Sequence, residues 1–162
     1  MIIGAGASGL AFADTLLEET DAHITLVDRR DKAGGQWNYA YPFVRLHQPS
    51  SYYGVSSLSL GRGSIDQSGL NEGFEELASG QEVTAYFHSV MLDRLLHSGR
   101  VRFLPMSEHL GGGEVRQLLS NRITQIDVRR RFVDARLLES GIPLTHQRQF
   151  HVAADVACIP PN

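Results

Sequence analysis

The sequence predicts an α/β domain of three layers: a parallel sheet with helices on one side and a small antiparallel sheet on the other. Three observations support this. Residues 1–28 have the pattern of a strand, a glycine turn, a helix and a second strand. An amphipathic helix over 83–97 leads into a third strand, and two later segments alternate apolar and polar residues. The length of 162 residues is that of one domain.

The N-terminal unit shows the clearest periodicity. Residues 1–3 resemble the end of a buried strand, and residues 9–20 repeat apolar side chains at helical spacing, with Leu10 and Leu17 on one face. Residues 23–27 form a short strand that ends at an aspartate. A strand, helix and strand of these lengths fit a right-handed parallel crossover.

The middle of the chain has a different composition. Residues 31–82 are rich in Gly, Ser, Tyr and Pro and predict a functional loop region, with one helical turn over 74–78. The second helix follows over Val83–His97, and Gly99 is its predicted stop. Val101–Leu104 is the predicted third parallel strand.

The last part of the chain predicts the antiparallel layer. A glycine turn at 111–113 precedes two alternating segments, 115–119 and 123–128, which we expect to pair. Residues 132–135 have the pattern of a strand that returns to the parallel sheet. Beyond 139 only short apolar pieces follow.

Composition excludes several classes of function. Fifteen basic and 18 acidic residues give a net charge of −3, which argues against binding to nucleic acid or an anionic membrane through bulk charge. The single Cys158, predicted to be a core residue, allows no internal disulfide or thiolate zinc site, and the seven histidines lack metal-ligand spacing. The three arginines at 129–131 are predicted at the solvated end of a strand. No basic leader or long apolar run is present, so we expect a cytoplasmic location.

A glycine motif follows the first strand. Gly4-Ala5-Gly6-Ala7-Ser8-Gly9 matches G-x-G-x-x-G and opens the first helix. In this motif the first glycine permits a tight turn, the second lets the backbone approach a pyrophosphate, and the third lets the helix pack on the strand. The amides and dipole at the start of the helix suit a diphosphate.

An acidic residue stands where this motif requires one. Asp28 lies 19 residues after Gly9, at the end of the second strand, where its carboxylate could accept hydrogen bonds from both hydroxyls of a ribose. It would repel a 2′-phosphate, which argues against NADP at this site. NAD and FAD share the adenosine end, so the motif alone does not separate them. The simpler alternative is a glycine turn followed by an exposed acid.

A second glycine turn, Gly34-Gly35-Gln36-Trp37, follows the acid. With the G-x-G-x-S-G motif and the pair Asp28-Arg29, it makes the chain resemble the flavin-containing monooxygenases and their Baeyer–Villiger relatives. Tyr41-Pro42 and residues 46–54 resemble the loop that approaches the flavin in those proteins.

The resemblance implies an FAD site. Met106, after the third strand, is placed where the family's backbone contacts adenine, and His47 lies in the loop that approaches the flavin. No catalytic residue is identified. The implied cofactor-binding residues are Gly4, Gly6, Ala7, Ser8, Gly9, Asp28, Arg29, Gly35, Gln36, Trp37, His47 and Met106.

The resemblance also implies a reaction. In such enzymes NAD(P)H reduces the FAD, and a peroxyflavin oxygenates a small organic substrate. This chain has no second G-x-G-x-x-G for NAD(P)H and lacks the monooxygenase fingerprint. We therefore expect residues 1–162 to be one FAD-binding domain, a truncated N-terminal portion of a longer flavoprotein with two dinucleotide domains, and incomplete as a catalyst. The alternatives are an NAD-binding dehydrogenase domain and a non-catalytic dinucleotide-binding module or remnant.

Overall fold

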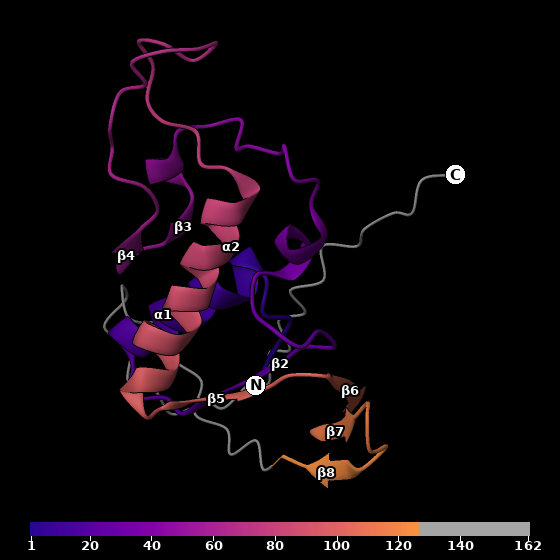
Figure 1. Cartoon of the computed structure of the whole chain (residues 1–162). Helices are drawn as coiled ribbons and strands as arrows, with labels where there is room; N and C mark the ends of the chain where they lie inside the picture. Colours follow the sequence, from indigo (N-terminus) through magenta and orange to yellow (C-terminus); the bar gives the residue numbers. More distant parts are fainter. Residues whose placement is uncertain (127–162) are drawn as a thin grey trace.

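A parallel sheet forms the centre of the fold. The computed structural model describes residues 1–126, and its central sheet has the strand order β1-β2-β5 (Figure 1). The strands are β1 (Ile2–Ile3), β2 (Ile24–Val27) and β5 (Val101–Leu104), close to the predicted ranges. Ile3 pairs with Val27, and Val27 pairs with Leu104, so all three strands end at the same edge. The loops that follow them therefore meet there.

Two helical segments cover one face of this sheet. They are α1 (Ala7–Glu19) and α2 (Gly80–Ser89), and α2 continues through a π-helical turn, η3 (Val90–Leu95), and a 3-10 turn, η4 (Leu96–Ser98). The crossovers β1–α1–β2 and β2–α2–β5 run in the same direction along the sheet, so right-handed connections place both helices on one face. The helices pack against each other through a core that includes Leu10, Val83, Phe87 and Leu95.

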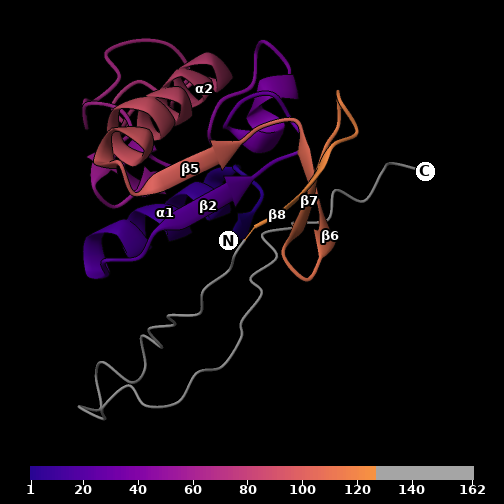
Figure 2. The same cartoon turned by 90° about the horizontal axis from the view of Figure 1, so that it is seen from below.

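The predicted antiparallel layer is present and larger than expected. Strands β6 (Ser107–Gly111), β7 (Glu114–Gln117) and β8 (Ile123–Gln125) form a sheet in that order. In Figure 1 it lies on the side of the parallel sheet away from α1 and α2, and in Figure 2 β2 and β5 point toward it. The pairing of β7 with β8 confirms the prediction. Strand β6 was not predicted because its only buried residue, Ser107, is polar.

The second helix begins before its predicted start. Ser79 is the N-cap: its hydroxyl accepts the Glu82 N–H at 3.3 Å, and the Glu82 carboxylate accepts the Ser79 N–H at 2.7 Å. This capping box adds a polar first turn ahead of Val83. The predicted stop is confirmed, because Gly99 has a φ of 69° after the last helical turn.

The predicted loop region holds only short elements between residue 31 and the start of α2 at Gly80. These are η1 (Gly35–Tyr39), η2 (Ser50–Tyr52), β3 (Gly54–Val55) and β4 (Leu58–Ser59). Figure 1 shows the segment that follows β4 projecting from the rest of the molecule.

The helical turn predicted over 74–78 is wrong. This segment is extended, with bridges from Glu75 to Ile65 and from Ser79 to Arg45. The reason lies in Glu76, whose backbone N–H donates to Ser64 and whose carbonyl accepts from the Ser50 N–H. These long-range hydrogen bonds take the place of the local ones that a helical turn would need.

A buried carboxylate joins three segments on the helical side. Asp14 of α1 is fully buried and accepts hydrogen bonds from the Ser57 N–H at 3.0 Å and from Arg94 Nε at 3.2 Å. Ser57 lies between β3 and β4, and Arg94 lies in the π-helical turn. A buried charge must be paired in this way, so Asp14 ties the β3–β4 hairpin to both helices.

Several predicted features lie outside the described residues. They are the end of the 123–128 strand, the 132–135 strand, the arginines at 129–131 and Cys158. Within residues 1–126, no helix is long and apolar enough to cross a bilayer. The same residues contain no group of three His, Cys, Asp or Glu side chains placed to hold a metal ion.

The capping box gives a first prediction. Ser79→Ala removes the side-chain acceptor at the start of α2, and we expect the free energy of unfolding to fall by about 1 kcal/mol. Chemical denaturation measures this change. Ser68→Ala, in an exposed loop, is the matched control and should change stability by less than about 0.5 kcal/mol. An equal effect of the two variants would contradict the role of the cap.

The Glu76 carboxylate gives a second prediction. Hydrogen bonds from the Ser64 hydroxyl and then from the Arg62 amide hold the pKa of Glu76 below its ordinary value. Because the folded-state pKa is depressed, the stabilisation is complete above the unfolded-state pKa and is lost as pH falls through the folded-state value. Thermal unfolding should therefore show the protein more stable than Glu76→Gln at pH 7. The difference should vanish in strong acid, and a difference that persisted there would contradict this account.

Candidate functional site

The candidate site lies where β1 and β2 end. Gly4 leaves β1 with a φ of 95°, a left-handed conformation that glycine adopts without strain. Gly6 is the N-cap of α1, no side chain caps the helix, and no acidic side chain lies in its first turn. The first amides of a helix lack partners within the helix, and the dipole makes this end positive. The start of α1 therefore suits an anion.

The three glycines of the motif serve different purposes. Gly4 is required by its φ. Gly9 is required by packing, since a Cβ there would lie 2.0 Å from the Gly4 carbonyl oxygen. Gly6 is required by neither: its φ is −83°, and a Cβ would be in ordinary contact with Gly35 Cα at 3.6 Å. The space beside Gly6 is consistent with the close approach of a ligand.

Asp28 holds the glycine turn in place. Its carboxylate accepts the Ala5 N–H at 2.6 Å and the Arg30 N–H at 2.8 Å, and the residue is only 6% exposed. The alternative of an exposed acid at a strand end is therefore wrong. Each carboxylate oxygen has a second lone pair, so Asp28 can still accept hydrogen bonds from ligand hydroxyls at this edge.

The second glycine turn packs directly on the first. The Gly34 N–H donates to the Ala5 carbonyl at 2.8 Å. A Cβ on Gly35 would lie 2.9 Å from Gly6 Cα, so the two backbones are in contact. Both Gly34 and Gly35 have positive φ, 113° and 55°. The contact places the start of η1 next to the start of α1.

A pocket opens beyond this second turn. Its volume is about 520 Å³, and its walls come from η1 and from the loop that follows, including the segment 46–54 that the sequence singled out. Three predicted residues, Gln36, Trp37 and His47, line it. The lining residues are Gln36, Trp37, Ala40, Tyr41, Val44, Arg45, Leu46, His47, Gln48 and Tyr53.

Aromatic contacts fix one wall of the pocket to the core. Trp37 Nε1–H donates to the Tyr53 hydroxyl at 2.7 Å, and the two rings meet edge to face with centroids 5.9 Å apart. Tyr53 in turn meets Phe87, a fully buried residue of α2, at 5.9 Å. The set of predicted site residues lacked Tyr53. The available signal was the cluster of aromatic residues in this loop.

The remaining predicted residues lie around the glycine turns. Ala7 and Ser8 begin α1, and Ser8 is exposed. Arg29 is largely exposed and pairs with Glu108 at 4.0 Å, toward the small sheet. Met106 donates its N–H to the Arg30 carbonyl and accepts the Leu118 N–H on its own carbonyl. A ligand at Met106 would therefore meet its side chain or the second lone pair of that carbonyl.

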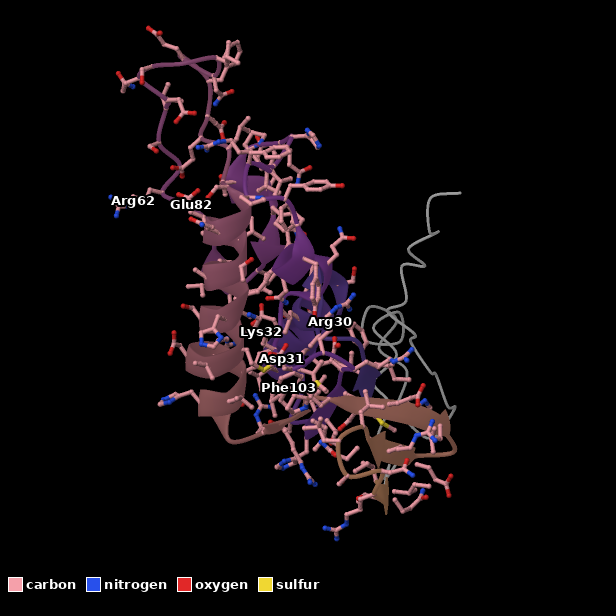
Figure 3. The ribbon with its side chains drawn as sticks, turned by 45° about the vertical axis from the view of Figure 1, so that its right-hand side comes forward. Arg30, Asp31, Lys32, Arg62, Glu82 and Phe103 are labelled. Carbon is pink, nitrogen blue, oxygen red and sulfur yellow. The ribbon has the colours of Figure 1, made fainter. Side chains whose placement is uncertain are left out.

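Charged residues continue from the acid into the second turn. Figure 3 shows Arg30, Asp31 and Lys32 together near the strand ends, far from Arg62 and Glu82. The Arg30 guanidinium lies 5.4 Å from the centre of the Tyr39 ring. This contact directs Arg30 toward η1, so Arg30 borders the second glycine turn.

The comparisons with known proteins agree with this geometry. Residues 2–53 match the family model of the NAD(P)-binding Rossmann-like domain. The segment from β1 through the second glycine turn is therefore similar to that domain, and the α/β fold of the described residues is Rossmann-like. The predicted fold class is confirmed. The family model supports the resemblance to the flavin-containing monooxygenases at the level of a dinucleotide-binding domain.

The relatives are longer than this chain. Uncharacterized proteins of Mycobacterium bovis (strain ATCC BAA-935 / AF2122/97) and Mycobacterium tuberculosis (strain ATCC 25618 / H37Rv) are 48% identical over all 162 residues. The chain spans 30% of the length of these curated relatives. A solved structure, the open crystal structure of cyclohexanone monooxygenase, shows 23% identity and a TM-score of 0.46. The match covers 75% of this chain and 24% of that one.

The glycine roles give a third prediction. Gly9→Ala forces a Cβ into the Gly4 carbonyl and should lower the free energy of unfolding by about 1–3 kcal/mol. Gly6→Ala meets only an ordinary contact and should cost less than about 1 kcal/mol. Urea denaturation of the two variants compares the costs directly. A larger loss for Gly6→Ala would contradict the assignment of the Gly6 space to a ligand.

Proposed function

We propose that this chain binds FAD and forms the flavin-binding part of an NAD(P)H-dependent oxidoreductase of the monooxygenase type. The observation that carries the proposal is the contact between the two glycine turns. It places the positive end of α1 next to η1, whose residues Gln36 and Trp37 line the pocket. A dinucleotide with a large ring system needs a site of this kind, with an anion site and a ring pocket side by side.

Each part of the surface suits one part of FAD. Asp28 would accept hydrogen bonds from the ribose hydroxyls, and the backbone from Gly6 to Ser8 would hold the diphosphate. Gln36 and Trp37 would border the ring system in the pocket. Bound FAD supplies the redox chemistry, and the residues of this chain bind it, orient it and exclude water.

The choice of FAD over NAD rests on the second turn and the pocket. The turn Gly34-Gly35-Gln36-Trp37 resembles that of the flavin-containing monooxygenases, and the pocket offers aromatic and aliphatic walls to a ring system. Asp28 disfavours a 2′-phosphate at the first site. A second candidate, an NAD-binding dehydrogenase domain, is favoured by the NAD(P)-binding description of the matching family.

The relatives extend the proposal to a longer protein. Because the chain spans 30% of their length, we place the NAD(P)H site and the site of a small organic substrate in the remainder of such a protein. On this proposal the chain alone holds FAD and lacks the parts needed for turnover. A binding module with no catalytic role is the alternative outcome.

The fourth prediction concerns retention of the cofactor. The protein, purified and reconstituted with FAD, should keep flavin through gel filtration at close to one per chain, measured by absorbance after denaturation. Gly6→Val should lose it, because the side chain occupies the position of the diphosphate. Thr15→Val, on the exposed side of α1, is the matched control and should retain flavin.

The outcomes separate the candidates. Calorimetric binding of NAD without retention of flavin would favour the dehydrogenase domain. Failure to bind either dinucleotide, or unchanged retention of flavin by Gly6→Val, would overturn the proposed site.

A further inference from the structure

We propose that the Tyr53 hydroxyl donates a hydrogen bond to the ring system bound in the pocket, and that Trp37 fixes the direction of this bond. The inference rests on the proposed FAD function and adds a residue that determines how the ring is held. Tyr53 is the binding residue, and Trp37 is a positioning residue that acts through it.

The donors and acceptors of this pair lead to the proposal. An indole N–H only donates, so the Tyr53 oxygen is the acceptor in the 2.7 Å bond from Trp37. A phenol hydroxyl also carries one proton to donate. Within residues 1–126, no side chain or carbonyl accepts that proton. Because Tyr53 lines the pocket, its proton is available to a molecule bound there.

The hydroxyl is held on a rigid support. The Tyr53 ring packs edge to face on Phe87 of α2, and its backbone N–H donates to the Ser50 carbonyl at 3.0 Å. The next residue, Gly54, touches Tyr86, since a Cβ there would lie 2.3 Å from the Tyr86 hydroxyl. These contacts leave Tyr53 little freedom to turn away from the pocket.

Trp37 is fixed from the other side. Its carbonyl accepts the Thr84 hydroxyl at 3.4 Å, and its ring lies 3.8 Å from the Cβ position of Gly80. With both rings anchored on α2, the indole N–H occupies one lone pair of the Tyr53 oxygen in a set direction. The hydroxyl proton is then restricted to the remaining directions, which is how a preorganised donor is built.

Two other polar side chains of the pocket are less well anchored. Arg45 already donates to the Leu77 carbonyl at 2.8 Å and is exposed, and His47 is exposed as well. The ligand chemistry that fits a fixed donor among apolar walls is a planar heteroaromatic ring with an acceptor atom on its edge. A flavin ring carries such acceptors in its carbonyl oxygens and ring nitrogens.

The fifth prediction tests this donor. Tyr53→Phe keeps the ring and removes the hydroxyl, so the Kd for FAD should rise about 5- to 10-fold, the effect of one lost hydrogen bond. Trp37 is the only tryptophan of the chain, so its fluorescence reports on this pocket directly. Quenching of that fluorescence by FAD gives the Kd. Tyr52→Phe is the matched control, because Tyr52 is the exposed neighbour, and its Kd should be unchanged.

Two further measurements separate donation from a purely structural role. The infrared bands of the bound flavin should shift in Tyr53→Phe and stay in place in Tyr52→Phe. A double-mutant cycle, with the Kd for FAD read from flavin absorbance, tests the coupling of the two residues. Trp37→Phe alone should weaken FAD binding, and the same substitution in the Tyr53→Phe background should weaken it by a smaller factor. Trp37→Phe also provides the test if Tyr53→Phe does not fold.

The outcomes distinguish this inference from the proposed function. If the unmodified protein binds FAD and Tyr53→Phe binds it equally well with unshifted infrared bands, the inference is overturned and the FAD site stands. If the unmodified protein does not bind FAD, the proposed function and this inference both fail. Weaker binding with shifted bands, together with non-additive effects of the two substitutions, supports the inference.

Discussion

The site depends on the contact between two turns that stand about thirty residues apart in the sequence. Gly35 approaches Gly6 so closely that a side chain on Gly35 would meet the Gly6 backbone at 2.9 Å. The bond from Gly34 to Ala5 fixes the same pair of turns. Because η1 starts at Gly35, this contact sets the position of Trp37 relative to the positive end of α1. On the proposed function, this arrangement would let one ligand reach from the start of α1 to the pocket.

The same helix supports the hydrophobic core and the pocket wall. Phe87 of α2 is fully buried in the core, and its ring also packs edge to face against the Tyr53 ring. At the start of α2, a Cβ on Gly80 would lie 2.7 Å from the Val44 side chain, so the loop that contains Val44 packs closely against this helix. The wall formed by Trp37, Val44 and Tyr53 is preorganised, because these residues cannot move without disturbing their packing on α2. This rigidity explains how a loop region of short elements can hold a defined site.

Much of the fold could be predicted from apolar periodicity alone. The three parallel strands and α1 were predicted within two residues because their buried positions are apolar and regularly spaced. The misses share a dependence on polar residues, which apolar periodicity does not register. The extended segment around Glu76 is held by the Arg62–Ser64 turn, and β6 buries a serine. The start of α2 was missed although the Ser79-x-x-Glu82 pattern was present in the sequence.

The residue types of the candidate site could be predicted from the sequence, but the structural role of each residue could not. The sequence identified three glycines as one motif. The structure shows that Gly4 is needed for its positive φ and Gly9 for close packing, whereas neither reason applies to Gly6. Tyr53 lies in the aromatic loop that the sequence singled out, but its contact with Trp37, 16 residues away, could not be predicted. Within residues 1–126, the missing side chain at Gly6 serves no contact that an alanine would prevent. The proposed FAD site gives this glycine a reason, because the diphosphate would lie beside Gly6 at the positive end of α1.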